Sequence, residues 1–437
     1  MFLYFLFIRI AAFFGHRKAR KLVQGQKEAF RFEPSAVKGC IWIHAASVGE
    51  FEQARPIIEK LRSHQPSAIS KKPLKIIVTF FSPSGYEARK NYELADGVYY
   101  LPFATRRNAK KFIEALQPKM AVFVKYEFWP AYIRELKKRN IPTYSICAYF
   151  RPKQYFFRWW GKGQLKTLRA FTHIFVQDEA SKELLAKHQV TNVTVAGDTR
   201  FDRMNELTKQ SAISSQYSDR LTPIAQFVEG CSRVIIAGST WQEDEILLQQ
   251  YMSTDRFTDG TQITDQVTKL ILVPHELNEE HLHFIFNLFQ GRYVTYSSVN
   301  TDRFTDRTQN TDLPESRQNI LRRADVLVVD TMGLLSSIYR FGQVAYIGGG
   351  FGEGIHNTIE AASYGMPVVF GTNYHAFREA HDLIRIGAAQ SIQNYSELES
   401  ALESALAQHE TLGQKATEYI QSELGATAKI CDRIFAK

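Results

Sequence analysis

Cysteine is scarce in this 437-residue chain, and its four residues, Cys40, Cys147, Cys231 and Cys431, are far apart and form no CxxC pair. This excludes a disulfide-stapled fold and indicates free thiols in a reducing compartment. The chain also lacks the ligand spacing of zinc fingers and the aromatic motif of RNA-binding domains, so we expect no nucleic-acid partner.

Acidic residues are fewer than basic ones, 45 Asp and Glu against 54 Lys and Arg, which gives a net charge of +9 and a pI near 9.2. Such a surplus favours an acidic partner, either anionic lipid or a phosphorylated substrate. The apolar content of 44% and charged content of 23% are typical of a folded globular protein. The length suits two domains.

The apolar run at the N-terminus is too short for an ordinary membrane-spanning helix. Residues 2–14 are nearly all apolar or aromatic apart from Arg9, and basic residues follow: Arg17, Lys18, Arg20 and Lys21. A spanning helix needs about 20 apolar residues, and a signal peptide carries its charge before the apolar run. We interpret the segment as an interfacial helix at an anionic membrane surface. The alternative is an apolar helix docked on its own domain.

Short apolar runs alternate with helical patterns along most of the chain, which indicates α/β architecture with largely parallel sheets. One series of strands begins at Ile41 and another at Arg233. The polar segment 204–230 separates them. We therefore expect an N-terminal membrane segment over 1–30, one Rossmann-like domain over 31–210 and a second over 211–437.

Residues 343–371, QVAYIGGGFGEGIHNTIEAASYGMPVVFG, predict a strand, a glycine loop, a short helix and another strand. The glycines let backbone N–H groups approach an anion at the start of the helix. Asn357 and Glu360 also have nearly the spacing of a capping box, which needs no ligand. Ile355 stands where the dinucleotide fingerprint requires glycine, so a typical NAD site is excluded.

Carboxylates follow predicted strands at several points. Glu50 lies in the turn Ser47-Val48-Gly49-Glu50, Glu127 lies in Tyr126–Pro130, and Asp330 opens Asp330-Thr331-Met332-Gly333. Ligands bind at the carboxyl edge of open α/β sheets, so Glu50 is a candidate general base. A structural alternative exists for each, because a carboxylate in a first helical turn complements the helix dipole.

Three histidines, His275, His281 and His283, invite a metal interpretation. Because residues two apart point to different faces of a helix, we expect no metal site. Two segments, 254–259 and 301–306, repeat the sequence TDRFTD. We interpret them as surface insertions without chemistry, since the ligand spacing of a calcium loop is absent.

Taken in order, a set of motifs resembles those of the 3-deoxy-D-manno-octulosonic acid (Kdo) transferases of lipopolysaccharide biosynthesis (glycosyltransferase family 30). The motifs are HAASVGEFEQARP at 44–56, YEFWP at 126–130, VQDEAS at 176–181, GDTRFDR at 197–203, GSTWQEDE at 238–245, DTMG at 330–333 and GGGFGEGIHNTIEAASYGMPVVFG at 348–371. The resemblance covers nearly the whole chain, including the N-terminal helix.

The resemblance implies an inverting GT-B glycosyltransferase, α/β with two Rossmann-like domains facing a central cleft. It would move Kdo from CMP-Kdo to the lipid A precursor lipid IVA, without a cofactor. It would act at the cytoplasmic face of the bacterial inner membrane, held peripherally or by a single N-terminal anchor. By match to the family, Glu50 is the catalytic base and Glu360 contacts the ribose. The residues expected to contact substrate are Ser47, Gly49, Glu127, Pro274, His275, Met332, Gly333, Leu334, Asn357, Thr358, Ile359 and Glu360.

The chain departs from the family pattern at four positions. Pro274 is followed by His275 rather than arginine, Gly333 is followed by Leu334 rather than glutamate, Trp241 replaces a common histidine, and Lys125 replaces an acidic residue. Two alternatives remain open. One is a GT-B enzyme of other nucleotide-sugar specificity, and the other is a non-catalytic, membrane-associated nucleotide-binding protein.

Overall fold

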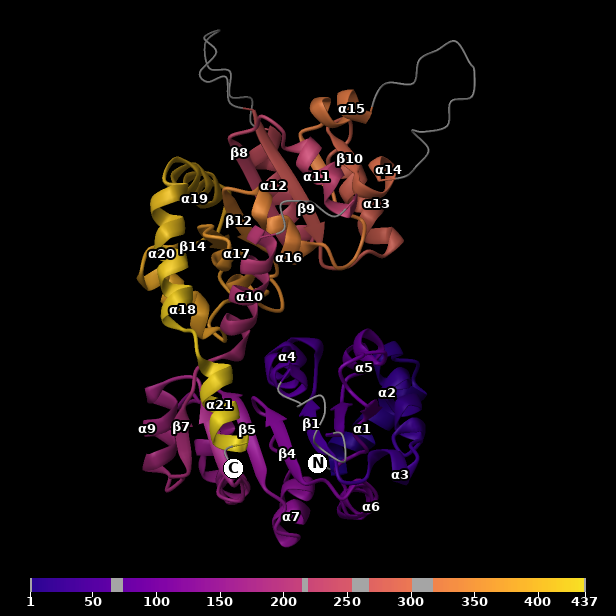
Figure 1. The fold of residues 1–437 in the computed structure, drawn as a ribbon. Helices are drawn as coiled ribbons and strands as arrows, with labels where there is room; N and C mark the ends of the chain where they lie inside the picture. Colours follow the sequence, from indigo (N-terminus) through magenta and orange to yellow (C-terminus); the bar gives the residue numbers. More distant parts are fainter. Residues whose placement is uncertain (1, 64–73, 214–218, 254–266, 301–316, 436–437) are drawn as a thin grey trace. The chain divides into compact units, whose positions relative to one another are not determined.

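The computed structural model describes residues 2–63, 74–213, 219–253, 267–300 and 317–435. The chain forms two compact units, one of residues 1–203 with 423–437 and one of residues 204–422 (Figure 1). The two TDRFTD segments lie outside the described residues. The unit boundary falls inside α10 (Thr199–Ile213), a few residues before the expected position.

The first unit is built on a seven-stranded parallel sheet with the order β3-β2-β1-β4-β5-β6-β7. All five residues of β1 are buried, as expected for a parallel strand covered on both faces. The strands are β1 (Ile41–Ala45), β2 (Ile76–Phe80), β3 (Gly97–Tyr100), β4 (Met120–Val124), β5 (Thr143–Ala148), β6 (His173–Val176) and β7 (Val193–Val195).

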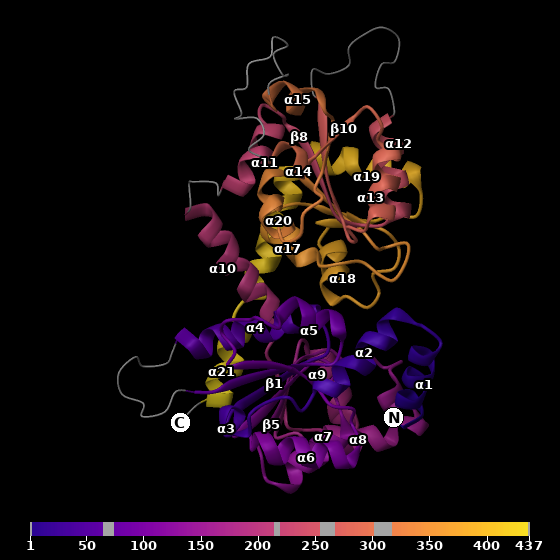
Figure 2. The same ribbon diagram turned by 90° about the vertical axis from the view of Figure 1, so that its right-hand side faces the viewer.

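Helices cover both faces of this sheet (Figures 1 and 2). Several begin at a side-chain cap: Ser82 Oγ accepts from the Gly85 N–H, and Asp178 Oδ1 accepts from the Ser181 N–H. The helices are α1 (Phe2–Phe13), α2 (Arg17–Glu28), α3 (Pro34–Val37), α4 (Val48–Ser63), α5 (Pro83–Arg89), α6 (Arg106–Leu116), α7 (Pro130–Lys138), α8 (Lys162–Leu168), α9 (Glu179–Lys187), the first part of α10, and α21 (Ala426–Phe435).

The last helix, α21, packs in the first unit, whereas the sequence suggested that it belongs with the second domain. Ile430, Cys431 and Ile434 are buried in the core between α4 and the sheet. The Asp202 carboxylate accepts hydrogen bonds from the Gly425 and Thr427 N–H groups, both at 2.6 Å. These contacts are between residues far apart in sequence, so periodicity alone gives no sign of them.

The second unit has its own seven-stranded parallel sheet, with the order β10-β11-β9-β8-β12-β13-β14. Its strands are β8 (Arg233–Thr240), β9 (Thr268–Pro274), β10 (Tyr293–Thr295), β11 (Val326–Val328), β12 (Val344–Ile347), β13 (Val368–Phe370) and β14 (Ala389–Ser391). Its helices are α11 (Thr222–Phe227), α12 (Gln242–Ser253), α13 (Glu279–Leu288), α14 (Tyr296–Val299), α15 (Arg317–Arg323), α16 (Leu335–Ile338), α17 (Thr358–Ser363), α18 (Arg378–Arg385), α19 (Tyr395–Ala407) and α20 (His409–Ser422).

Each sheet has one point where the strand order reverses. In the first sheet this switch point lies between β1 and β4, and in the second it lies between β8 and β12. The loops that leave these strands at their carboxyl ends are the default ligand sites of open α/β sheets. The α/β prediction is confirmed, although the sequence analysis missed two short edge strands, β7 and β14.

Candidate active site

Glu50 lies at the first switch point. It occupies the first turn of α4, directly after β1, and its Oε2 accepts a 2.6 Å hydrogen bond from the Ala46 N–H. Ser47 Oγ accepts from the Glu50 N–H at 3.4 Å. The carboxylate therefore complements the helix N-terminus, as the structural alternative expected. Gly49 is exposed beside it.

Glu127 reaches the same edge from the other strand of the switch point. It follows β4, after Lys125 in a left-handed conformation with φ 50°. Its Oε2 lies 3.1 Å from His44 Nε2 and accepts a 2.5 Å hydrogen bond from Trp129 Nε1. Two groups thus hold this carboxylate in one orientation.

A buried polar chain supports Glu127 from within the sheet. Trp42 Nε1 donates to Thr79 Oγ1 at 2.8 Å, and that oxygen lies 2.9 Å from His44 Nδ1. His44 Nδ1 also lies 3.0 Å from the Thr79 carbonyl oxygen, and Trp129 Nε1 lies 3.1 Å from His44 Nε2, so both ring nitrogens have hydrogen-bond partners. Trp42, His44 and Thr79 are fully buried. The chain therefore fixes the histidine, and through it the carboxylate.

The Glu127 carboxylate affects the ionisation of Glu50. Burial, reinforced by the negative charge of Glu127, raises the pKa of Glu50 to about 8. The Ala46 N–H and the Lys125 ammonium act in the opposite direction, but they do not offset the burial. A carboxylate with a pKa near the working pH has the basicity that a general base needs.

The second switch point carries the glycine loop, residues 348–354. A Cβ on Gly348 would lie 2.4 Å from the Ser239 carbonyl oxygen, and one on Gly350 would lie 2.5 Å from Gly371 Cα. Glycine is therefore required at both positions, because backbone segments approach too closely for a side chain. The loop meets the strand ends of β8 and β13 backbone to backbone.

A buried aspartate holds the start of this loop. Asp244 Oδ2 accepts from the Gly349 N–H at 2.9 Å and from the Trp241 N–H at 3.0 Å, and its Oδ1 accepts from Tyr346 Oη at 2.7 Å. Burial raises the pKa of Asp244, and its three donors act against that rise. The loop conformation therefore depends on a carboxylate that the sequence analysis did not single out.

Three aromatic rings stack beside the loop. The Trp241 and His275 ring centroids are 4.8 Å apart, and those of His275 and His356 are 4.3 Å apart. Burial, together with His275, lowers the pKa of His356 to about 4, which keeps that ring neutral near pH 7. His275 and Trp241, two of the departures from the family pattern, thus form one surface with His356.

The four residues expected at the helix after the loop are close together. Asn357 caps α17 by accepting from the Ile359 N–H at 3.2 Å, and its Nδ2 donates to Glu360 Oε1 at 3.0 Å. Ile359 and Thr358 are buried, and Thr358 Oγ1 has no hydrogen-bond partner among the described residues. Of these side chains, only Asn357 and Glu360 are partly exposed.

The turn after β11 places the other expected donor residues differently. Met332 is 71% exposed, whereas the Leu334 side chain is buried in the core, which leaves only its backbone for a ligand. Gly333 has φ 83°, a value that favours glycine. Asp330 Oδ1 accepts from the Ser297 N–H at 2.8 Å. Pro274 is buried at the end of β9.

The histidines considered as metal ligands have other roles. His281 Nε2 lies 2.9 Å from Glu245 Oε2, and its Nδ1 lies 3.0 Å from the Glu276 carbonyl oxygen. Within the ranges that the structure describes, no three His, Cys, Asp or Glu side chains form a group able to hold a metal ion.

The sequence analysis missed His44, Thr79, Asp244 and His356. One signal for the first two was available: a histidine and a threonine interrupt two otherwise apolar strands, and β1 and β2 pair them directly, His44 with Thr79. Polar residues inside buried strands need partners, so such a pair predicts a buried polar network.

The N-terminal helices combine a docked face with an exposed end. Phe5 and Ile8 of α1 are buried in the first core, and the Phe5 ring stacks on Phe103 with centroids 4.4 Å apart. Phe13 and Phe14, at the end of α1, are 83% and 80% exposed. One face of α1 is therefore docked on its own domain, whereas the C-terminal end of the helix is exposed. No helix among the described residues has the length and apolarity needed to cross a bilayer.

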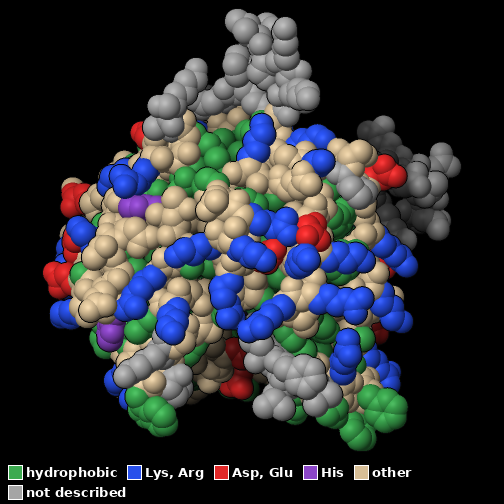
Figure 3. Space-filling view, turned by 90° about the horizontal axis from the view of Figure 1, so that it is seen from below, with side chains coloured by type: hydrophobic (Ala, Val, Ile, Leu, Met, Phe, Trp, Pro, Cys, Tyr) green, Lys and Arg blue, Asp and Glu red, His purple; other side chains and the backbone are tan. Residues whose placement is uncertain are grey.

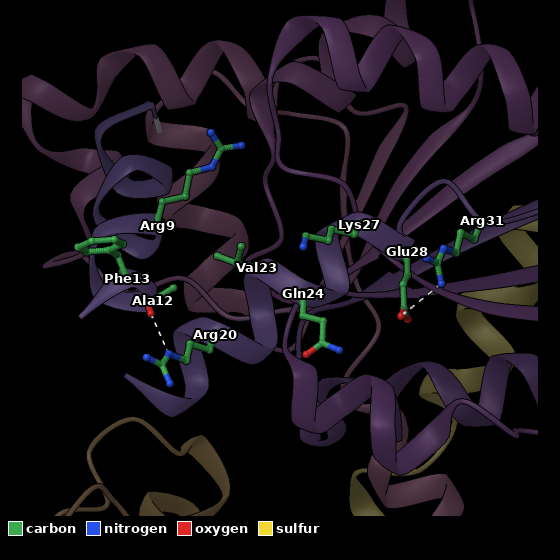
Figure 4. A pocket seen from close by; sticks show the side chains of 9 residues that line it. All are labelled: Arg9, Ala12, Phe13, Arg20, Val23, Gln24, Lys27, Glu28 and Arg31. Atoms are coloured by element: carbon green, nitrogen blue, oxygen red, sulfur yellow. Dashed lines mark hydrogen bonds and ion pairs between the residues drawn. The ribbon is translucent and has the colours of Figure 1, made fainter. Parts of the chain in front are cut away.

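A groove of about 520 Å³ lies between α1 and α2. Figure 4 shows the side chains that line it, where Arg20 Nε donates to the Ala12 carbonyl oxygen at 3.0 Å and Arg31 forms a 3.6 Å ion pair with Glu28. Arg9, Arg20, Lys27 and Arg31 give the groove a basic character next to Phe13.

Comparison with known proteins points to one family. The family described as 3-Deoxy-D-manno-octulosonic-acid transferase (kdotransferase) matches residues 17–203, which contain Glu50 and Glu127. A 3-deoxy-D-manno-octulosonic acid transferase from Aquifex aeolicus is 26% identical over 84% of this chain and 86% of its own length. Over most of its length the chain is therefore similar to Kdo transferases, and its residues 17–203 match the model of that family.

Two further comparisons define the limits of this assignment. A bifunctional glycosyltransferase/methyltransferase from Fusobacterium nucleatum is 27% identical over 83% of this chain. The match covers 52% of the length of that relative. UDP-GlcNAc 2-epimerase from Neisseria meningitidis has the same fold, with a TM-score of 0.60, 14% identity, and 91% of this chain and 100% of that chain covered. The expected GT-B fold is confirmed.

Proposed function

We propose that this protein moves Kdo from CMP-Kdo to the phosphorylated glucosamine disaccharide of a lipid A precursor, with inversion at the anomeric carbon. The observation that carries the proposal is the carboxylate pair at the first switch point. Glu50 and Glu127 come from loops 77 residues apart in sequence, yet Glu127 contributes to the pKa of Glu50.

Glu50 is the general base in this mechanism. It removes the proton from the primary hydroxyl of the acceptor, and the oxygen attacks the anomeric carbon of Kdo on the face opposite CMP. The bond from that carbon to the CMP phosphate breaks, and CMP leaves as an anion. Because CMP needs little protonation to leave, one carboxylate base suffices, in contrast to the acid–base pair of glycosidases.

The second unit binds CMP in this proposal. The N-terminus of α17 and the turn at Gly333 supply the donors for the phosphate, and Glu360 is an acceptor for the ribose hydroxyls. Preorganised donors of this kind stabilise the charge that develops on the leaving phosphate. His275 and Trp241 offer a flat surface in place of the arginine common in the family.

We also propose that the protein binds the surface of an anionic membrane through α1 and α2. The exposed rings of Phe13 and Phe14 would enter the headgroup region, and Arg9, Arg17, Arg20 and Lys21 would contact anionic lipid. This arrangement brings the enzyme to an acceptor that is itself an anionic lipid.

The decisive experiment measures CMP release and lipid modification with CMP-Kdo and a tetraacylated lipid A precursor in detergent. The proposal predicts transfer by the wild-type protein. Absence of transfer, with CMP failing to raise the melting temperature, would contradict it.

The structural similarity to UDP-GlcNAc 2-epimerase supports one alternative, an enzyme that acts on a UDP-sugar. Thermal stabilisation separates the two. Our proposal expects CMP to raise the melting temperature more than UMP or UDP does, whereas the alternative expects the reverse.

A further inference from the structure

A second hollow, of about 600 Å³, lies between α7 and α8 of the first unit. Pro130 and Tyr155 line it, and three basic side chains, Arg134, Lys137 and Lys166, stand along it. The lining residues of α7, Pro130, Arg134 and Lys137, are spaced four and three residues apart, so they share one face of that helix. Neither the mechanism nor the proposed membrane contact uses this hollow.

The basic side chains of the hollow lack acidic partners. Among the described residues, no carboxylate forms an ion pair with Arg134, Lys137 or Lys166, and all three are exposed. Arg134 donates from Nε to the Pro130 carbonyl oxygen at 2.9 Å, which leaves its terminal nitrogens for a ligand. Figure 3, a view from below, shows a face of the protein with many more Lys and Arg than Asp and Glu side chains. An anionic group is the complementary ligand.

One acceptor in the hollow is left without a partner. Gln164 Oε1 is buried and has no hydrogen-bond partner among the described residues. A buried carbonyl oxygen without a donor costs free energy, so it calls for a hydroxyl or N–H from outside the chain. The hollow therefore offers cationic donors for a phosphate together with an acceptor for a hydroxyl or amino group.

The hollow includes Pro130, which lies three residues after Glu127 in the chain. Pro130 directly follows Trp129, whose Nε1 donates to Glu127. At the same end, the negative charge of Glu127 contributes to the raised pKa of Tyr155, after the larger effect of burial. A ligand in the hollow would therefore extend from the neighbourhood of Glu127 along α7 toward Lys137.

We propose that the hollow between α7 and α8 binds a phosphorylated amino sugar, with Arg134, Lys137 and Lys166 on the phosphate and Gln164 Oε1 accepting from a sugar hydroxyl or amino group. This inference builds on the proposed function, because it makes the hollow the subsite for the phosphorylated end of the acceptor.

The test measures the affinity of glucosamine 1-phosphate for the full-length Glu50→Gln protein, which binds without turnover. In this background we compare Lys137→Glu with Lys138→Glu. Lys138 is the adjacent, exposed residue of α7 and does not line the hollow, so the two variants change the net charge equally. We expect Lys137→Glu to weaken binding about tenfold or more, and Lys138→Glu by less than about twofold.

A second variant tests the neutral contact. Gln164→Met should weaken glucosamine 1-phosphate several-fold and leave inorganic phosphate unchanged. Equal losses for Lys137→Glu and Lys138→Glu would show general electrostatic attraction and overturn the proposal. So would the failure of glucosamine 1-phosphate to bind at millimolar concentration, or an equal loss of both ligands in Gln164→Met.

A binding experiment with lipid shows whether the hollow recognises the phosphate of a glycolipid or only a free phosphosugar. It also distinguishes a failure of this inference from a failure of the proposed function. In detergent micelles, a phosphorylated glucosamine disaccharide lipid should bind more tightly than its dephosphorylated form, and Lys137→Glu should remove the difference. If transfer from CMP-Kdo occurs but Lys137→Glu and Lys138→Glu have equal acceptor KM values, the subsite is wrong and the proposed function stands. If the phosphosugar binds as expected but no Kdo is transferred, the subsite stands and the proposed reaction is wrong.

Discussion

The two switch points of this protein have the same topology and opposite chemistry. The first, between β1 and β4, carries two carboxylates that long side chains bring together. The second, between β8 and β12, carries glycines, and Gly350 and Gly371 meet backbone to backbone. The first edge presents charge through side chains, whereas at the second edge the backbone packs against backbone, and the N–H groups of Gly348, Gly349, Gly352 and Gly354 donate within the chain.

In the proposed reaction, this difference assigns the base to the first edge and the leaving group to the second. A base needs a carboxylate with a raised pKa, and the first edge provides it through burial and a neighbouring negative charge. An anionic leaving group needs fixed donors, and at the second edge Asp244 holds the loop in place from a buried position with its oxygens occupied. Four changes test or sharpen this contrast.

The largest effect should come from Glu50→Gln, which leaves the shape of the first edge unchanged and removes its base. We expect kcat for Kdo transfer to fall by about 10²–10⁴-fold, the usual contribution of a general base. Nucleotide binding should change little, because Glu50 is absent from the second edge. Steady-state kinetics together with CMP titration check both parts.

The same variant should be more stable than wild type in alkaline solution. Because the pKa of Glu50 is raised in the folded state, the folded protein binds this proton more tightly than the unfolded chain does. The resulting stabilisation is fully present below the ordinary pKa of 4.5 and is lost as the pH rises through about 8. The glutamine amide of the variant cannot ionise, and we expect the substitution to raise the free energy of unfolding at pH 9 by roughly 1–3 kcal/mol, with little change at pH 4. Urea unfolding at the two pH values measures this.

Gly350→Val should damage the second edge alone. The added Cβ would lie 2.5 Å from the Gly371 backbone, so the loop must shift, at a cost of roughly 2–4 kcal/mol in the free energy of unfolding. CMP should no longer raise the melting temperature. Gly352→Ala is the control, because a Cβ there meets no atom within 4 Å. Equal destabilisation by both substitutions would refute the close-packing argument.

Glu127→Gln should shift the pH dependence of the first edge. Removing the neighbouring negative charge lowers the pKa of Glu50, so the rising limb of kcat/KM should move toward acid by on the order of one pH unit. The apparent pKa of the kcat/KM profile reports the change in the ionisation of Glu50. A loss of acceptor contact would lower only the plateau value of kcat/KM and leave that pKa unchanged. An unshifted limb would mean that burial alone sets the pKa of Glu50.

The smallest effect on catalysis should come from replacing Phe13 and Phe14 by serine, because both rings are exposed and neither touches the switch points. Activity toward a detergent-solubilised acceptor should be unchanged. Binding to vesicles containing anionic lipid should weaken about tenfold or more, as measured by sedimentation. Phe5→Ser is a poor test, since that ring is buried and its loss would unfold α1.

Most of the fold could be predicted from the sequence because buried parallel strands are continuous apolar runs, as Met120–Val124 and Leu270–Val273 show. The edge strands β7 and β14 are three residues long, with partly buried or exposed side chains, and give no such signal. The docking of α21 depends on contacts between Asp202 and Gly425, more than two hundred residues apart.

Several residues of the candidate site that follow a strand could be named from the sequence, whereas the polar residues inside strands could not. Glu50, Glu127 and the glycine loop stand at strand ends, where topology brings them to a shared edge. His44 and Thr79 lie within strands, and their role depends on register, which is a property of pairing. Leu334 shows the limit of motif matching, since its side chain is buried away from any ligand.

The pH dependence of Kdo transfer by the wild-type protein tests the central claim most directly. With saturating CMP-Kdo and a solubilised lipid A precursor, log kcat/KM for the acceptor should rise with pH with a slope of one and level off above about pH 8, where Glu50 is ionised. The rising limb should be absent from the residual activity of Glu50→Gln. A wild-type profile that is flat between pH 6 and 9, or an identical limb in Glu50→Gln, would contradict the assignment of Glu50 as the base.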